Sequence, residues 1–297
     1  MNPTYRRGLY AIAAGILTLP LLLYTKAQLQ RPPRVGSTQP LFEGITYHRQ
    51  WHPTPAPYLL HVVAIDLTAP GIEVQASPRI LTDDEFATTA QTTSQFLSAH
   101  NLQIAINGNY FFPFKEKTPW NFYPHAGDPV NVVGEAIAYG QRYSAPDPRW
   151  PAVCFASNQQ AQLAIDGTCP DGTQHAIAGR EVLLVDGQPH PDLKGGAPYA
   201  RVAIALNKAG TRLWLIVVDG KQPNYSQGIT LAQLTQHSQA LGADTALNLD
   251  GGGSATLVKA SPQGAVVLNA PIHARVPGLE RPVATQLGFR AKTLAQQ

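Results

Sequence analysis

The residues most suited by type and spacing to carry out chemistry are Asp250-Gly251-Gly252-Gly253-Ser254, which follow an apolar stretch of the chain. Three successive glycines are costly to order and give up side-chain packing, and a plain tight turn would need only Asp-Gly. Glycine offers close backbone approach, and successive N–H groups in such a turn can form a concave anion-binding nest. The run therefore predicts an anion or sugar site with Asp250 at its mouth and the Ser254 hydroxyl beside it. A tight hairpin turn is the alternative.

Two other polar segments also follow apolar stretches. They are residues 107–111 (Asn-Gly-Asn-Tyr-Phe) and residues 218–220 (Val-Asp-Gly). Each segment alone is typical of a plain turn. Together with residues 250–254 they place polar groups at the ends of strands, where binding sites on rigid sheets tend to collect.

The elements that must position these groups are short apolar runs between turn residues. We expect strands at residues 59–67, 72–76, 103–107, 202–206, 212–218, 245–249, 255–259 and 283–289, and helices at 88–100 and 230–241. Thr230 is a typical N-cap and Gly242 a typical terminator. Residues 112–150 show little periodicity and are long for a loop, so they are either functional or partly structured. Strands outnumber helices without a regular βαβ alternation, which predicts a single α+β domain with a mixed β-sheet core and a few helices.

The composition fits a folded protein that does not bind nucleic acid. The chain has 297 residues, of which 44% are hydrophobic and 14% charged, with a net charge of +3. The hydrophobic share allows a sizeable core and argues against wholesale disorder. No Lys/Arg-rich block interleaved with aromatic residues is present. A nucleic-acid partner is therefore not predicted.

The N-terminus carries an export pattern. Arg6 and Arg7 precede an apolar run over residues 9–24, which is typical of a secretory signal peptide or a signal anchor. This run is shorter than the ~20 residues of a comfortable membrane span, so residues 1–27 remain either cleaved signal or anchor. Residues 28–44 are polar and Pro-rich and are predicted to be a linker, followed by one domain over residues 45–292. We expect an extracytoplasmic protein, membrane-anchored if the segment stays uncleaved and otherwise secreted or periplasmic.

Cysteine usage agrees with export. Cys154 and Cys169 are the only two cysteines, and in an oxidising compartment they could close a loop worth about 3 kcal/mol. Asp166-Gly167 between them is a hairpin signal that would bring the thiols together across paired strands. A catalytic thiol is the alternative, but no His stands in a recognisable relation to either cysteine.

Six motifs in a fixed order resemble the phosphodiester glycosidase family over about residues 60–290. They are residues 107–111 (NGNYF), 201–203 (RVA), 217–220 (VVDG), 228–231 (GITL), 246–256 (ALNLDGGGSAT) and 280–284 (ERPVA). The family includes the enzyme that removes N-acetylglucosamine from a phosphodiester-linked mannose. Asn109 departs from the family's pattern, which often has a second glycine there, and Ala255 stands where a second Ser is common.

The resemblance implies hydrolysis of a sugar 1-phosphodiester, with roles for particular residues. Asp250 is the candidate acid, base or nucleophile, and Asp219 and Glu280 are candidates for a second carboxylate. The candidate substrate-binding residues are Asn107, Arg201, Asn248, Gly251, Gly252, Gly253, Ser254 and Arg281. The two arginines suit bidentate phosphate binding, and the aromatic residues Trp120, Phe122 and Tyr123 could stack on a sugar or only pack their own loop.

Several alternatives stay open beside an exported hydrolase of a sugar 1-phosphodiester in an envelope or extracellular glycan. One is a non-catalytic glycan-binding or exopolysaccharide-assembly protein with the same fold, although the presence of Asp250 and Arg201 counts against it. Another is a hydrolase of other phosphodiesters, such as teichoic-acid-like polymers or nucleotide sugars. No cofactor is assigned and no metal-ligand motif occurs, but a divalent cation held by Asp219 and Asp250 is an alternative. A Ser254 nucleophile lacks a Gly-x-Ser-x-Gly motif and an assignable His.

Overall fold

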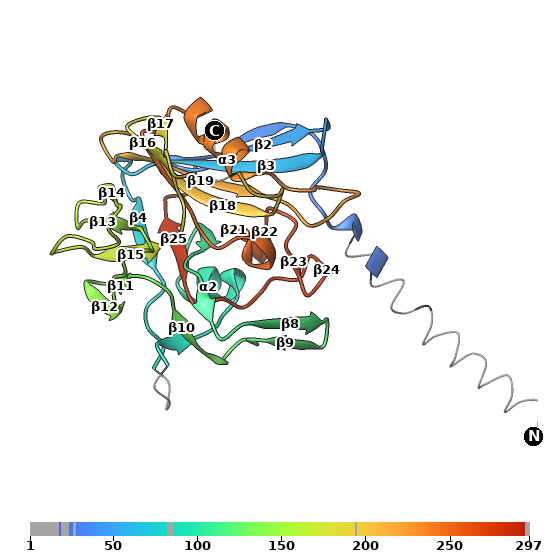
Figure 1. Ribbon diagram of the computed structural model, residues 1–297, viewed down its shortest axis with the longest axis horizontal. Helices are drawn as coiled ribbons and strands as arrows, with labels where there is room; N and C mark the ends of the chain where they lie inside the picture. Colours follow the sequence, from blue (N-terminus) through green and yellow to red (C-terminus); the bar gives the residue numbers. More distant parts are fainter. Residues whose placement is uncertain (1–17, 19–23, 26–27, 82–85, 194, 295–297) are drawn as a thin grey trace, which may run out of the picture.

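Two antiparallel sheets pack face to face and form the centre of the protein (Figure 1). The computed structural model describes residues 18, 24–25, 28–81, 86–193 and 195–294. The larger sheet has eight strands in the order β1-β2-β3-β19-β18-β20-β16-β17. Their bounds are β1 Ser37–Phe42, β2 Ile45–His52, β3 Tyr58–Asp66, β19 Arg212–Val218, β18 Arg201–Leu206, β20 Thr245–Asn248, β16 Val182–Val185 and β17 Gln188–Pro189.

The second sheet has five strands in the order β22-β21-β6-β25-β4. Their bounds are β22 Gly264–Val267, β21 Leu257–Ser261, β6 Ile104–Asn107, β25 Gln286–Arg290 and β4 Glu73–Ala76. Side chains from the facing surfaces of both sheets, such as Val63 and Ile204 from the larger and Ile106 and Phe289 from the second, form the largest buried cluster. Burial of this cluster is the main source of stability, because apolar area removed from water contributes roughly 25 cal/mol per Å².

Two helices cover the outer faces of this sandwich. α3 (Leu231–Ala240) packs Leu231 and Leu234 onto the larger sheet, and α2 (Thr93–Ala99) packs Phe96 and Leu97 onto the second. Both helices begin with a capping box, in which a threonine side chain accepts from the backbone three residues on and a glutamine side chain accepts in return. The order from one side to the other is therefore α3, larger sheet, second sheet, α2.

A third sheet and several short strand pairs lie at the periphery (Figure 1). The third sheet is ordered β12-β11-β15-β13-β14, with bounds Gln141–Ser144, Ala136–Ala138, His175–Ala178, Ala152–Phe155 and Ala161–Ala164. Another has the order β5-β10-β7, with bounds Thr88–Thr89, Pro129–Val132 and Phe111–Phe112. Two hairpins complete the fold: β8 Lys115–Thr118 with β9 Asn121–Tyr123, and β23 Ile272–His273 with β24 Val276–Pro277.

The predicted α+β class is confirmed, and the central strands lie close to their predicted places. The helix predicted at residues 88–100 is shorter, because Thr92 takes an extended N-cap conformation (φ −73°, ψ 156°) and residues Thr88–Thr89 form β5 instead. The aperiodic stretch 112–150 is partly structured, since it contributes parts of three small sheets.

Only part of the N-terminal prediction concerns residues that the structure describes. Most of the proposed signal or anchor, residues 1–27, lies outside the described residues. Among the described residues no helix is long and apolar enough to cross a membrane. The linker predicted over residues 28–44 is wrong in its second half, where Ser37–Phe42 pair with β2 as the edge strand β1. The residues just before it are also held down, because the Tyr225 hydroxyl donates to the carbonyl of Pro32 at 2.6 Å.

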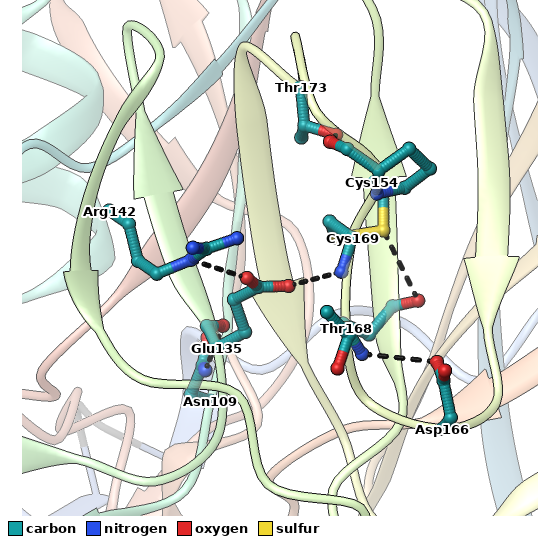
Figure 2. The surroundings of a disulfide bond; sticks show 10 residues. Asn109, Glu135, Arg142, Cys154, Asp166, Thr168, Cys169 and Thr173 are labelled. Carbon is teal, nitrogen blue, oxygen red and sulfur yellow. Dashed lines mark hydrogen bonds and ion pairs between the residues drawn. A yellow bond between two sulfur atoms is a disulfide. The ribbon is translucent and has the colours of Figure 1, made fainter.

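The predicted disulfide is confirmed, with Cys154 and Cys169 joined at a Cα–Cα distance of 5.7 Å (Figure 2). The proposed reason for it is wrong. Cys154 pairs with Gln162 of β14 on one side and with Ala176 of β15 on the other, and Cys169 lies in the connection between these two strands. Asp166-Gly167 is the turn after β14 that carries Cys169 back, and not the hairpin between the paired strands.

Candidate active site

The glycine run connects the two central sheets. It leaves the larger sheet at the end of β20 and enters the second sheet at the start of β21. The Gly252 N–H donates to the carbonyl of Ala200, beside the start of β18, at 2.9 Å. The Asp250 N–H donates to the carbonyl of Gly108, beside the end of β6, at 3.3 Å. The loop is therefore fastened to both sheets, and Asp250 is fixed where the sheets diverge.

Two of the glycines are required by close contacts with the segment before β18. A Cβ at Gly251 would lie 2.5 Å from the carbonyl oxygen of Ala200. Gly252 has a φ of +62°, and a Cβ there would lie 2.7 Å from the ring of Tyr199. Distances this short do not occur for real Cβ atoms. These positions therefore accept glycine alone without movement of the backbone or the aromatic ring.

The predicted anion-binding nest is wrong, because most N–H groups of the run are used inside the protein. Gly252 donates to Ala200, and the Ser254 N–H donates to the carbonyl of Gly251 at 3.1 Å. The Gly251 N–H hydrogen-bonds to the carboxylate of Asp250. The run thus brings backbone close to its neighbours and orients a carboxylate, and a ligand must be held by side chains.

Those side chains surround a pocket of about 280 Å³ at the glycine run. It is lined by an acid, two arginines, a glycine and four aromatic residues: Asp250, Arg201, Arg281, Gly251, Tyr110, Phe111, Phe114 and Tyr199. Aromatic rings suit the apolar faces of a sugar, and guanidinium groups suit phosphate. The pocket therefore combines the two kinds of group that a sugar phosphate requires.

Asp250 has an unusual acidity for an aspartate. Burial raises its pKa to about 6, against hydrogen bonds from the Ser254 hydroxyl and the Gly251 N–H and the charge of Arg281, which all favour the ionised form. An acid that titrates near neutral pH can both give and take a proton under ordinary conditions, which is the property of a general acid or base.

Arg281 packs against an aromatic ring and against the glycine run. Its guanidinium carbon lies 4.5 Å from the centroid of the Phe114 ring. At Gly253, a Cβ would come within 2.3 Å of Arg281 Nη2. The third glycine of the run is therefore explained by this arginine, which packs directly on the backbone.

The N–H groups of Arg281 are largely engaged within the protein. Nη1 donates to Ser254 Oγ at 3.0 Å and Nε donates to His273 Nδ1 at 3.2 Å, while Nη2 forms an ion pair with Glu116. Burial lowers the pKa of His273 to about 4, so this ring is neutral and accepts at Nδ1. Arg281 thus orients Ser254, and through it Asp250, while its own charge is balanced by Glu116.

Arg201, at the start of β18, has a different environment. Nε donates to the carbonyl of Ile229 at 3.3 Å and Nη2 donates to the carbonyl of Ala197 at 3.2 Å. No carboxylate of the described residues forms an ion pair with it. Burial lowers its pKa without bringing it into the neutral range, since an arginine stays protonated in proteins. Arg201 is therefore a cation whose charge is available to a ligand.

The two candidate asparagines use their amides within the protein. Asn107 donates to the carbonyl of Asp250 at 2.6 Å and accepts from the N–H of Thr256 at 3.1 Å, so it clamps both ends of the glycine run. Asn248 donates to Glu181 Oε2 at 2.8 Å. Both are fully buried. Neither asparagine lines the pocket, and Asn107 supports the position of the loop.

Asp219 does not reach the pocket. It is buried, with Oδ2 bound to His61 Nε2 at 3.1 Å and Oδ1 accepting from the Ala270 N–H at 2.7 Å and from Asn269 Nδ2 at 3.1 Å. Both carboxylate oxygens thus have partners within the protein, away from the pocket. In the described part of the chain no three or more His, Cys, Asp or Glu side chains are grouped as metal ligands.

Glu280 is likewise directed elsewhere. Its carboxylate accepts from both the N–H and the hydroxyl of Ser94, in the first turn of α2. Burial raises its pKa. The structure therefore gives Glu280 the role of satisfying a helix N-terminus, and brings only Asp250 of the three candidate carboxylates to the pocket.

Comparison with known proteins agrees with this arrangement. A family model for phosphodiester glycosidases matches residues 100–290. The chain belongs to the phosphodiester glycosidase family. The match includes every group that lines the pocket, and the family is one of hydrolases. No curated protein sequence gives a significant match to the chain.

Solved structures show that this member of the family shares its fold with distant proteins. The zebrafish N-acetylglucosamine-1-phosphodiester alpha-N-acetylglucosaminidase catalytic domain, auto-inhibited by its pro-peptide, matches with a TM-score of 0.61 and 18% identity, over 88% of this chain and 87% of that one. A protein described as exported, from Burkholderia pseudomallei, matches with a TM-score of 0.63 and 13% identity, over 88% and 97%. A hypothetical protein from Synechocystis matches with a TM-score of 0.63 and 14% identity over 88% of this chain, which spans only 64% of that protein.

The sequence did not identify several residues of the site. Tyr110 and Phe111 belonged to a recognised motif but were given no role, and Phe114 and Glu116 lie in the aperiodic segment where no pattern distinguished them. Two aromatic residues considered as sugar-stacking candidates lie elsewhere. Trp120 is 82% exposed, and the rings of Phe122 and His273 meet edge to face with their centroids 4.5 Å apart. Neither lines the pocket.

The disulfide is connected to the site through one buried acid (Figure 2). Glu135 accepts from the Cys169 N–H at 2.6 Å and from Arg142 Nε at 2.7 Å. Its backbone carbonyl accepts from Asn109 Nδ2 at 3.1 Å, and Asn109 precedes Tyr110 of the pocket wall. The non-glycine residue at position 109 thus has a structural reason, because its amide fastens the pocket wall to the third sheet.

Proposed function

We propose that the protein is an exported hydrolase that cleaves a sugar 1-phosphodiester linkage in an envelope or extracellular glycan. The observation that carries the proposal is Asp250, a carboxyl group with a pKa of about 6, at a pocket that also holds four aromatic residues and an arginine with no carboxylate partner among the described residues. Membership of the phosphodiester glycosidase family supports the reaction class.

Recognition of the substrate is divided between a charged group and the aromatic rings of the pocket. Arg201 binds the singly charged phosphate, because its charge has no carboxylate partner among the described residues. Tyr110 and Tyr199 provide aromatic faces for the sugar ring. A pocket of about 280 Å³ is matched to one sugar ring and its phosphate and leaves the remainder of a glycan outside.

Asp250 moves the proton in the reaction. Hydrolysis adds water across the linkage, so that the hydroxyl joins carbon or phosphorus and the proton ends on the leaving oxygen. In its ionised form Asp250 accepts this proton from water and then returns it to the leaving oxygen. Near neutral pH the phosphate changes from one negative charge in the diester to about two in the monoester product, and Arg201 stabilises the charge that develops.

The remaining candidates position the glycine run. Asn107 holds both of its ends, and Asp219 acts through Asn269, whose Nδ2 also donates to the carbonyl of Ala255 at 2.9 Å. Arg281 and Ser254 orient the Asp250 carboxylate. In this proposal catalysis rests on Asp250, and loss of a positioning residue lowers activity by displacing the loop.

Export is supported by two independent features. A disulfide persists in oxidising compartments, and one similar structure is of a protein described as exported. Residues 1–27 would direct export as a signal peptide or anchor, and the folded domain would begin at β1. A cleaved segment gives a secreted or periplasmic protein, and an uncleaved one gives a membrane-anchored protein.

The test is turnover of a chromogenic N-acetylglucosamine 1-phosphodiester by the soluble part of the chain from residue 28, with and without a chelator. Asp250→Asn is expected to abolish turnover, and the matched control Asp171→Asn, an exposed aspartate of the third sheet, is expected to retain it. Teichoic-acid-like polymers and nucleotide sugars test the rival phosphodiesters. An inactive parent that binds glycans with Asp250 intact would replace the hydrolase with the glycan-binding alternative.

A further inference from the structure

Glu116 brings a negative charge to Arg281 of the pocket wall from an element outside the two central sheets. It lies on β8, in the hairpin β8–β9 (Figure 1). Its carboxylate pairs with Arg281 Nη2 and lies 3.5 Å from His273 Nδ1 and 4.0 Å from Lys221 Nζ. Burial raises the pKa of Glu116, but the neighbouring Arg281 and Lys221 charges outweigh it and keep the pKa below its usual value. Glu116 is therefore ionised near neutral pH.

This ion pair separates the roles of the two arginines of the pocket. The charge of Arg281 is neutralised by Glu116, and its N–H groups also serve Ser254 and His273. The hydrogen bonds of Arg201 go to carbonyl oxygens, and no carboxylate of the described residues forms an ion pair with it. Beside the partly ionised Asp250, the pocket thus offers the guanidinium charge of Arg201 to a ligand.

The number of charges distinguishes substrate from product in this reaction. A phosphodiester carries one negative charge, whereas a phosphomonoester carries nearly two above its second pKa of about 6. Cleavage of the linkage at the phosphorus–oxygen bond or at the bond between oxygen and the sugar carbon yields a monoester. A pocket whose lining carries one cation without a carboxylate partner among the described residues accommodates the first ligand and leaves the second with an excess charge near the Glu116 carboxylate.

We propose that Glu116 is a specificity-determining residue that makes the pocket favour singly charged phosphodiesters over doubly charged phosphomonoesters. This inference rests on the proposed function and adds to it a basis for selectivity and for product release. Glu116 does not take part in the bond cleavage. It acts by reducing the positive charge that a monoester would need.

The experiment compares two ligands that differ in charge and share a sugar: N-acetylglucosamine 1-phosphate and its methyl diester. Binding is measured by calorimetry at about pH 8 in an Asp250→Asn background, where the diester is not consumed and residue 250 has no charge. Adding Glu116→Gln is expected to shift the ratio of the two dissociation constants toward the monoester by about tenfold, the size of one partly screened charge interaction.

Two further variants separate charge from folding. Lys221→Gln removes a neighbouring cation from a different loop, so it is expected to shift the ratio in the opposite direction, toward the diester. Glu73→Gln removes an equivalent carboxylate from β4, where it pairs with Arg290 away from the pocket, and should leave the ratio unchanged. A structural role for Glu116 would weaken both ligands alike and would not reverse sign with Lys221.

The outcomes distinguish this inference from the proposed function. An unchanged ratio in both Glu116→Gln and Lys221→Gln, with both ligands still bound, overturns the role of Glu116 and leaves the hydrolase proposal standing. If folded protein binds neither ligand in any variant, both proposals are overturned. Opposite shifts in the two variants, with none in Glu73→Gln, establish the selectivity.

Discussion

Replacement of Asp250 by Asn should remove activity and at the same time stabilise the protein above pH 6. Burial raises the pKa of Asp250 from 3.8 to about 6. The folded state therefore holds its proton more tightly than the unfolded chain does. Ionisation of Asp250 therefore lowers the free energy of unfolding. This penalty is absent below pH 3.8, grows as the pH rises toward 6, and is complete above pH 6.

The size of the effect follows from the shift. Each unit of pKa corresponds to about 1.4 kcal/mol, so a shift of about two units gives an upper value of about 3 kcal/mol. Because Asp250 is partly exposed at the pocket, solvent screening reduces this to about 2 kcal/mol. Asn is neutral and nearly isosteric, and it is free of the penalty at every pH.

The assay is urea-induced unfolding of the parent and Asp250→Asn at about pH 4 and about pH 8. The two free energies of unfolding should agree within about 1 kcal/mol at the lower pH, and the variant should be more stable by about 2 kcal/mol at the higher pH. Hydrolysis by the parent should rise through a limb near pH 6 if the ionised form is the working base. A stability difference that does not change with pH, or a variant less stable at pH 8, would refute the assignment of a buried, destabilised carboxylate.

Three other perturbations test separate parts of the site. Arg201→Ala should raise KM by about tenfold to a hundredfold, since a charge-assisted hydrogen bond contributes about 1.5–3 kcal/mol. Arg201→Lys should recover part of this loss of binding. Equal KM values for the parent and Arg201→Ala would show that Arg201 does not bind the phosphate. Gly252→Ala should lower the free energy of unfolding by about 2 kcal/mol or more and remove most of the activity, because φ is +62° and the new Cβ meets Tyr199. Adding Tyr199→Ala should restore part of the stability. No restoration would rule out the contact between the new Cβ and Tyr199 as the cause. The double replacement of Cys154 and Cys169 by Ser should lower the free energy of unfolding by about 3 kcal/mol; reducing agent should destabilise the parent and leave the double variant unchanged.

The sequence predicted the central strands well and gave a candidate site, for identifiable reasons. Strands such as β19 and β20 are apolar runs with clear turn residues at their ends, and their position in the chain can be read without knowledge of their partners. The glycine run marked the site because three glycines have a cost that only close contacts repay. Those contacts, with Tyr199 and Arg281, come from segments distant in sequence.

Partnerships across the fold could not be predicted in the same way. Asp219 and Glu280 belong to recognised motifs, and nothing in their local sequence shows that His61 and Ser94 occupy their carboxylates. Glu116 belongs to a segment without periodicity, so its pairing with Arg281, 165 residues later, depends wholly on the tertiary structure. The anion nest failed for a related reason, since a free loop was assumed where the N–H groups have partners within the protein.

The position of β25 has a consequence for the order in which the protein can assemble. This strand comprises Gln286–Arg290, yet it lies in the middle of the second sheet, between β6 and β4. That sheet therefore cannot close until the ribosome has delivered β25, which is distant in sequence from β6 and β4. Arg281 also follows most of the pocket residues along the chain, and folding is expected to be slow because these contacts are distant in sequence. The segment from Arg281 to Arg290 thus completes both the second sheet and the pocket.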